Sequence, residues 1–517
     1  MSSDVPQPAE TALSTMPKPA VRHAEKRRIA TCTFADRIAT AALGVYRRVV
    51  AEPRPHPTCV TAILVYNQEK DSLTVVALGV GTKFLSDTLL REEVKDASTS
   101  RQEKQKQQQQ SVYGRRVRDL HAEVLCRRAF RRYLSERFQQ DMWLYVLRFQ
   151  QDIQPHVNDT TAMDDFWEYS TDKRRWRLRS GYTLHAYLSS TPCGNATVKK
   201  FATLSKEHFQ ADLPLWPTEA HQVQTGHSVH LGQFALLLKK DVSAARQSEK
   251  EMGTQMCASS PRATDIPTQN VPAGTSAVNA RQGSLHTCSD KICRWNYLGW
   301  QGSLLASLVE APLHMTTLTV GRKFSRACLQ RAVCCRLDDA ALSRKVANQR
   351  RGRDSSRADT QTQPPVHHPS VMCTAVYVEP DAVVIPQTNQ DQNDMQFIDT
   401  RAFVWWPGLT QAQCLDATTG WVAAVTHADD VAIESPVSTR QLTEIFQQIQ
   451  QGRFLDDEST ATTNHVASLT DLRAFKQQVS STYEARKEEL FQNPVMRMWV
   501  RRSAYLVESP VSCPNAE

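Results

Sequence analysis

The sequence predicts an α/β fold, built as one large domain that polar insertions interrupt. Runs rich in β-branched residues, typical of strands, alternate with segments whose apolar residues recur at helical spacing. The 517 residues are 40% hydrophobic, which is enough for a substantial core. Low-complexity segments separate the patterned ones. We expect the domain to cover residues 31–510.

The N-terminal half begins with a tail and continues with helix and strand patterns. Residues 1–30 are rich in Pro, Ser and Ala and predict a disordered tail. Residues 35–50 have the apolar spacing of an amphipathic helix. Segments 58–66 and 72–84 are rich in β-branched residues and predict two strands. A second helical pattern begins at Ala122.

The C-terminal part returns to strand patterns and closes on helices. Segments 182–190, 234–240 and 371–386 predict strands, and Pro and Gly follow the first of them. Segments 438–451 and 471–491 each have the apolar spacing of one helix.

Three polar insertions are expected near residues 97–113, 242–284 and 343–370. Their Gln-rich, Ser/Thr-rich or Arg-rich composition cannot build a core, and we expect disordered loops. We expect no catalytic part for the Gln tract. The basic run at 344–353 fits an RNA contact, a nuclear signal or simply a solvated loop.

The charge and cysteine content favour an intracellular protein with a polyanionic partner. Lys and Arg exceed Asp and Glu by 62 − 54 = 8, and the sequence pI is near 8.8. No apolar run reaches the ~20 residues of a membrane span, and the N-terminus lacks the apolar core of a secretory signal. The 13 cysteines form no regular framework. We expect a cytoplasmic or nuclear protein that binds no membrane and no DNA.

A histidine and a glutamate stand two residues apart where the second helical pattern begins. This pair, His121 and Glu123, occurs by chance at many ordinary helix starts. A zinc site that activates water needs three nitrogen or sulfur ligands, an open position and a carboxylate that moves protons. Nucleobase deaminases meet this need with one histidine, two cysteines and a glutamate that is not a ligand.

Cysteines further along the chain can complete such a site. Cys193 follows a predicted strand in TPCGNAT, where backbone N–H groups favour a thiolate. The short cytidine-deaminase pattern would place the second cysteine at Ala196, so the second thiolate must come from elsewhere. Cys288 is the best candidate, and the residues alone leave Cys293 open as an alternative.

Three blocks of sequence resemble, in this order, the signature blocks of the RNA adenosine deaminase family. They are HAEVLCRRAF (121–130), STPCGNAT (190–197) and CSDKICRWNYLGWQGSLL (288–305). The family holds editing deaminases that act on double-stranded RNA and a tRNA deaminase that acts on the adenosine just 3′ of the anticodon in alanine tRNA. Further likeness lies in GVGTKF, which ends at Phe84, in YEARKEELF (483–491) and in Trp499, so the resemblance covers roughly residues 33–505.

The resemblance implies a fold, a metal and a reaction. The implied fold is a cytidine-deaminase-like three-layer core, a mixed central sheet with flanking helices, extended by C-terminal helices that enclose an inositol phosphate. Zinc would bind His121, Cys193 and Cys288, because the family has an apolar residue at the position of Cys293. Glu123 would be the proton shuttle of a hydrolytic deamination that converts adenosine to inosine.

The same resemblance places two residues beside the flipped nucleotide. Thr82 would lie near the ribose 2′-OH and Lys83 at a phosphate.

Several cations should converge behind the metal site. Arg127 and Arg128 follow the His-Ala-Glu turn, and Lys291 and Arg294 follow Cys288. They form either a solvated face or a buried cluster, and buried cations need a polyanion. The resemblance implies inositol hexakisphosphate as that polyanion.

The positions that match the family's inositol phosphate ligands are Arg127, Arg128, Lys291, Arg294, Gln301, Ser303, Tyr483 and Lys487, with Arg440, Lys476, Arg501 and Arg502 as looser matches. Asp119 would link Lys291 to the metal site. Arg501 departs from the pattern, since an editing relative has an acidic residue there.

A deaminase domain with basic insertions and no accessory module looks most like the alanine-tRNA type of the family, so the resemblance implies tRNA as the partner, at position 37 of alanine tRNA. The N-terminal tail is too short for a double-stranded-RNA-binding domain, which the editing members carry. The alternatives are editing of another structured RNA and a non-catalytic RNA-binding protein with a structural zinc. Glu123 argues against the second, because a structural site needs no proton shuttle.

Overall fold

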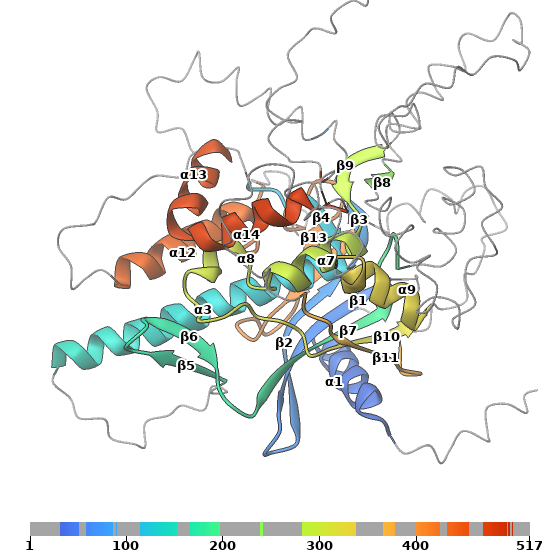
Figure 1. Cartoon of the computed structure of the whole chain (residues 1–517), viewed down its shortest axis with the longest axis horizontal. Coiled ribbons are helices and arrows are strands. Elements are labelled where there is room, and N and C mark those ends of the chain that lie inside the picture. The colour runs from blue at the N-terminus through green and yellow to red at the C-terminus, as the bar shows by residue number, and fades with distance from the viewer. Residues whose placement is uncertain are drawn as a thin grey trace, which may run out of the picture.

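The computed structural model describes residues 32–50, 58–85, 89, 114–151, 166–196, 238–240, 282–337, 366–377, 400–423, 432–453, 469–493, 495, 496 and 499. Within these residues, the strands of the largest sheet lie in the order β11-β10-β7-β1-β2-β12-β13 (Figure 1). The seven strands are β1 (Val60–Asn67), β2 (Ser72–Val80), β7 (Tyr182–Ser190), β10 (Thr317–Arg322), β11 (Ser370–Cys373), β12 (Arg401–Trp405) and β13 (Gln413–Asp416).

The sheet is mixed. β10 pairs in parallel with both β7 and β11, and all other neighbours pair antiparallel. The hairpin from β1 to β2 closes through a short turn, whereas the parallel neighbours β7 and β10 are joined by a long connection.

Helices cover both faces of this sheet. Alternate residues of β1 pack into two different cores: Ile63 joins the core under α3 (Ala122–Gln151), and Leu64 joins the core under α1 (Phe34–Val49). Helix α1 starts with a capping box between Thr33 and Asp36. Helix α3 approaches β2 so closely that a Cβ on Gly79 would lie 2.3 Å from the backbone of α3.

The C-terminal helices gather beside α3 at one end of the sheet (Figure 1). Helix α12 (Thr439–Arg453) packs on α3, and α14 (Ser481–Gln492) packs on α13 (Leu469–Val479) and on α7 (Cys288–Leu298). The short helix α8 (Gly302–Ala306) lies between them and contacts all three C-terminal helices. The predicted α/β class, with a mixed central sheet and flanking helices, is confirmed.

Two predicted elements are divided in the structure. Residues 72–84 form β2 and then, after Gly81, the separate strand β3 (Thr82–Phe84), which pairs with β4 (Asp119–His121). Residues 471–491 were expected to form one helix but lie in α13 and α14. The helix breaks at Ser480, whose hydroxyl donates a 2.5 Å hydrogen bond to the carbonyl of Ser303.

Other elements lack a clear pattern in the sequence. The small sheet β5–β6 (Trp167–Ser170 and Arg175–Leu178) and the strands β9 (Gln282–His286), β10, β12 and β13 were not predicted. β9 pairs with β8 (Leu238–Lys240), which lies within the predicted strand 234–240. After β10 the chain forms α9 (Arg326–Gln330) and the π-helical turn η4 (Arg331–Cys335).

Some predictions fall outside the described residues. These are the tail 1–30, most of each predicted insertion, residues 234–237 of one predicted strand and residues 378–386 of another. Residues 282–284, at the end of one predicted insertion, are the first residues of β9, and residues 366–370, at the end of another, run up to and include the first residue of β11. In the described part of the chain, no helix is both long and apolar enough to span a bilayer.

Candidate metal centre

His121 is held at the junction of a strand and a helix. It ends β4, directly before α3, and pairs across the strands with Thr82. Its ring Nδ1 lies 2.9 Å from Oδ1 of Asp119 and 3.1 Å from the carbonyl oxygen of Lys83. Both neighbours are acceptors, so Nδ1 carries the ring proton and the lone pair of Nε2 is left for a metal.

Two cysteines approach His121 from other elements. Cys193 lies in the loop after β7, and Cys288 is the first residue of α7. The backbone N–H of Cys288 donates to Sγ of Cys193 at 3.3 Å, which stabilises a thiolate. Gly194 permits the loop to pass, because its φ is +98° and a Cβ there would lie 2.2 Å from the hydroxyl of Thr287.

The donor atoms of His121, Cys193 and Cys288 all lie within 4.8 Å of one another. One imidazole and two thiolates suit a borderline-soft divalent ion such as zinc, and three protein ligands leave a fourth position for water. Cys288 is buried, whereas His121 and Cys193 keep partial exposure, so the group opens to one side. Cys293 lies one and a half turns further along α7, buried in another cluster with Leu337 and Phe491.

Glu123 lies in the first turn of α3, two residues after His121, and is buried. Its negative charge helps to raise the pKa of two thiols, that of Cys59, just before β1, and that of Cys126. Burial, with the charge of Glu123 adding to it, raises the pKa of the Cys59 thiol to about 12. Cys59 therefore stays a protonated thiol beside the carboxylate, and nothing in its sequence context marked it as part of the site.

A charged network supports the ligands from behind. The ammonium of Lys291 pairs with Oδ2 of Asp119, the carboxylate that contacts His121. Deeper in the core, Asp290 accepts from Arg336 at 2.8 Å, and both side chains are fully buried. Asp290 also accepts from Thr287 at 2.8 Å, which ties the start of α7 to this ion pair.

The residues predicted for substrate contact lie beside the metal group. Thr82 stands opposite His121 in the antiparallel pair, so its side chain is on the same face. Lys83 pairs with Leu120, and its side chain is exposed.

Several of the predicted inositol phosphate ligands have protein partners. Lys487 pairs with Glu484, which also accepts from Ser303 at 2.6 Å. Gln301 uses both ends of its amide, accepting from the backbone of Leu313 and donating to that of Leu298.

Two further arginines of the predicted set bond to protein groups near the start of α12. Arg128 donates to the carbonyl of Val437 at 2.7 Å, just before α12. Among the looser matches, Arg440 pairs with Glu434 at 2.5 Å, while Arg501 and Arg502 lie outside the described residues.

The remaining arginines form a cluster between α3, α7 and α14. Arg127 lies over the ring of Trp295 at 4.8 Å, and Arg294 over that of Trp499 at 4.6 Å. Burial lowers the pKa of Arg127 well below its ordinary value, and Arg131, Arg294 and Arg128 lower it further. Arg131, one turn after Arg127, was not predicted.

Buried donors in this cluster lack a protein acceptor. The Nε atoms of Arg127 and Arg131 are inaccessible to solvent and have no hydrogen-bond partner within the described residues. Burial also lowers the pKa of Arg131, while the nearby Tyr483 raises it. Cationic groups in this position need an anion.

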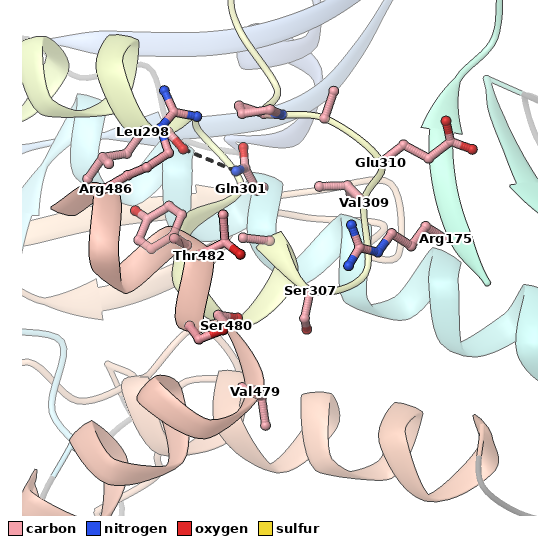
Figure 2. Close-up of a pocket in the computed structure, with 15 residues that line it drawn as sticks. Arg175, Leu298, Gln301, Ser307, Val309, Glu310, Val479, Ser480, Thr482 and Arg486 are labelled. Carbon is pink, nitrogen blue, oxygen red and sulfur yellow. Dashed lines mark hydrogen bonds between the residues drawn. The ribbon is translucent and has the colours of Figure 1, made fainter. Parts of the chain in front are cut away.

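A pocket of about 220 Å³ opens near this cluster (Figure 2). Its lining joins α14 to the loop after α8 and includes Gln301, Tyr483, Arg175 and Arg486. Figure 2 shows the Gln301 amide bonded to the Leu298 carbonyl at its edge.

Similarity to known proteins agrees with this geometry. Residues 99–503 match the model of the adenosine-deaminase (editase) domain. The chain is 25% identical over 59% of its length to the double-stranded RNA-specific adenosine deaminase of Rattus norvegicus, of which it covers 21%. It is 22% identical over 52% of its length to tRNA-specific adenosine deaminase 1 of Mus musculus, covering 58% of that protein.

A third relative is the double-stranded RNA-specific editase Adar of Drosophila melanogaster, 27% identical over 44% of this chain and 27% of its own length. The chain thus spans less than two thirds of each of these relatives. The family match, in contrast, runs through His121, Cys193 and Cys288 and through most of the 517 residues. The chain belongs to the adenosine-deaminase (editase) domain family.

Proposed function

We propose that this protein is a zinc-dependent hydrolase that converts adenosine to inosine in RNA. The observation that carries the proposal is the convergence of His121, Cys193 and Cys288 within 4.8 Å, with the buried carboxylate of Glu123 on the adjoining helical turn. A purely structural zinc site has no use for such a carboxylate, so the arrangement favours catalysis over a purely structural role.

The roles of the residues follow from their positions. Zinc bound by the three ligands would supply a Lewis acid that lowers the pKa of water towards neutrality. Glu123 takes a proton from the attacking water and delivers it to N1 of adenine. It then takes the remaining proton from the hydroxyl group formed at C6 and passes it to the amino group, so that the C6–N bond breaks and ammonia leaves. Asp119 keeps the proton on Nδ1 of His121, so that Nε2 remains a ligand. Burial of Glu123 excludes competing water from the proton path.

The finer proposal is that the substrate is tRNA, at the adenosine 3′ of the anticodon (position 37) in alanine tRNA. The tRNA-specific relatives support it, because the chain covers 58% of the Mus musculus protein. The net charge of +8 suits an RNA partner. Thr82, on the face of His121, would contact the ribose of the flipped nucleotide, and the exposed Lys83 would contact a phosphate.

Double-stranded RNA is the second candidate substrate. The match to the Rattus norvegicus enzyme favours it, since this match has the higher identity, 25%, and covers more of the chain, 59%.

We propose inositol hexakisphosphate as a structural cofactor bound by the arginine cluster. The buried Nε atoms of Arg127 and Arg131, which have no hydrogen-bond partner in the described part of the chain, support an anion there. The family pattern proposes Arg127, Arg128, Lys291, Arg294, Gln301, Ser303, Tyr483 and Lys487 as ligands, and of these Ser303 and Lys487 bond to Glu484 in this structure. Arg127, Arg131, Arg294 and Tyr483 are the residues with which we expect the phosphates to interact.

The experiment that tests the function is inosine mapping by reverse transcription and sequencing. Zinc-loaded protein from a eukaryotic host, which supplies inositol phosphates, is incubated with alanine tRNA or with a long RNA duplex. Inosine next to the anticodon, formed by wild type and lost by about 10²–10⁴-fold or more in Glu123→Gln, is the expected result. Inosine found only in the duplex would favour double-stranded RNA as the substrate.

Zinc analysis of the Glu123→Gln protein is the control. Retained zinc with lost turnover separates the proton-transfer role from metal binding. Folded, zinc-loaded wild type that forms no inosine in either RNA would contradict the proposed reaction.

A further inference from the structure

A second group of soft metal ligands lies away from the candidate metal centre. Cys334 and Cys335 end the π-helical turn η4, and His368 stands just before β11. Sγ of Cys334 lies 3.5 Å from Sγ of Cys335, which lies 3.7 Å from Nδ1 of His368. The three donor atoms are all within 4.8 Å of one another.

These separations agree with a shared tetrahedral ion. Zinc–sulfur bonds of ~2.3 Å and zinc–nitrogen bonds of ~2.0 Å place two sulfur ligands about 3.8 Å apart, and sulfur about 3.5 Å from nitrogen. The distances from Cys335 to Cys334 and to His368 both lie within a few tenths of an ångström of these values. Two thiols and an imidazole are also the ligand types that zinc selects.

Packing and hydrogen bonds fix the two segments of the chain that carry these ligands. Cys334 is buried in the main core, and its thiol donates to the carbonyl of Gln330 at 3.1 Å. Beside His368, the ring of His367 stacks on His314 at 4.5 Å and bonds to the carbonyl of Met315 at 2.8 Å.

Strand β11 begins two residues after His368 and pairs with β10. The ligands therefore do not depend on a free loop for their position.

Exposure of the group permits an ion to enter. Cys335 and His368 are exposed, whereas Cys334 is buried beneath them. The group thus has a buried side and a solvent side, where water can take the fourth position. No residue of the candidate metal centre takes part.

We propose that Cys334, Cys335 and His368 form a second zinc site, structural in role. It ties the end of η4 to the start of β11. Leu337, after η4, and Val366, before β11, pack in one apolar cluster, so the ion joins two parts of the chain that already share a cluster.

Metal content is the first test. Protein titrated with Zn²⁺ and freed of excess ion by gel filtration is analysed by mass spectrometry of the metal. Wild type should hold two zinc ions per chain. The double variant Cys335→Ser/His368→Ala should hold one, and the variant Cys288→Ser should also hold one. Cys373→Ser, which removes an exposed cysteine of β11 outside the group, should keep two. One zinc in wild type, or two in the double variant, would overturn the proposal.

Alkylation of individual cysteines is the second test. It uses wild-type protein, so it does not depend on whether a variant folds. Iodoacetamide labelling, read by peptide mass spectrometry, compares zinc-loaded protein with protein treated with a chelator. Cys335 should be protected at least ten-fold by zinc, whereas Cys373, equally exposed, should react alike in both samples. Equal labelling of Cys335 in both, or a Cys334–Cys335 disulfide in the freshly purified protein, contradicts a zinc site there.

Discussion

Asp119 serves two partners at once, one through each carboxylate oxygen. Oδ1 lies 2.9 Å from Nδ1 of His121, and Oδ2 pairs with Lys291. A neutral amide at this position would keep the size of the side chain but lose the charge that holds both contacts. Such a change would lower the zinc affinity of the site, because the ring of His121 would lose its fixed tautomer.

We predict that Asp119→Asn lowers zinc affinity by about 10–100-fold, the usual effect of removing a carboxylate that supports a metal-bound histidine. Competition with a chromophoric zinc chelator measures this. Asp71→Asn is the matched control, since Asp71 forms an exposed ion pair with Arg37 far along the chain from the ligands. An unchanged affinity in Asp119→Asn would show that Asp119 does not orient the ligand.

We predict that Cys288→Ser loses zinc from the candidate metal centre and all turnover, whereas Cys293→Ser keeps both. Cys288 is in the ligand group, and Cys293 lies in a separate apolar cluster. Zinc content and inosine formation are measured on the same preparations. The opposite outcome would exchange the two assignments.

The sequence predicted individual site residues where their spacing matches the needs of a metal site. His121 and Glu123 stand out because a ligand and a proton carrier share one turn, and Cys193 because it follows a strand. Cys59 and Arg131 could not be identified, since each joins the site only through packing between segments far apart in the chain.

The contact between β2 and α3 is the element that places His121 and Glu123 against the sheet. It depends on Gly79, whose missing side chain lets the start of α3 lie directly on the strand. Periodicity predicted both elements but not their distance, which is set by three-dimensional packing. The same limit explains the division of 471–491, where the tertiary bond of Ser480 to Ser303 ends α13 in a segment that has continuous helical spacing.

We predict that Gly79→Ala destabilises the protein by about 1–3 kcal/mol or more, because its Cβ would meet backbone atoms of α3 that cannot move independently. Gly44→Ala is the control. It adds the same methyl group to α1, where nothing lies within 4 Å, and should be neutral or stabilise by up to ~1 kcal/mol. Urea unfolding measures both, and equal effects would contradict the close contact.

The whole molecule carries buried histidines that make its stability depend on pH. His185, on the central strand β7, is bonded to the hydroxyls of Thr183 and Thr317, and burial lowers its pKa to about 4. The unfolded chain binds this proton near pH 6.5. Between these values the unfolded state binds more protons, so stability falls as pH falls from about 6.5 to about 4.

We predict that His185→Gln weakens this dependence. The melting temperature of wild type should fall more between pH 7 and pH 5 than that of the variant, whatever their difference at pH 7. Thermal unfolding at the two pH values measures the effect. The same pH response in both proteins would contradict a neutral, buried His185.

The arginine cluster also acts on the molecule as a whole, since it joins α3, α7 and α14. We predict that Arg127→Ala lowers stability by about 3–5 kcal/mol in protein that contains its polyanion, the cost of breaking a buried charge pairing. Arg177→Ala, which removes an exposed ion pair with Glu168, should leave the stability nearly unchanged, because water and salt screen such a pair. Equal melting temperatures for the two variants would point to a solvated cluster.

The packing of Leu337 and Val366, which border residues 338–365, has a practical consequence. Because Leu337 and Val366 pack in one cluster, the two borders of residues 338–365 are held together by the described fold. Each doubling of the length of a flexible chain between two such borders costs only about 0.6 kcal/mol in closure entropy. A fluorescent domain or an affinity tag inserted there would report on the protein without disturbing its sheet, which makes this junction the natural place to label the molecule.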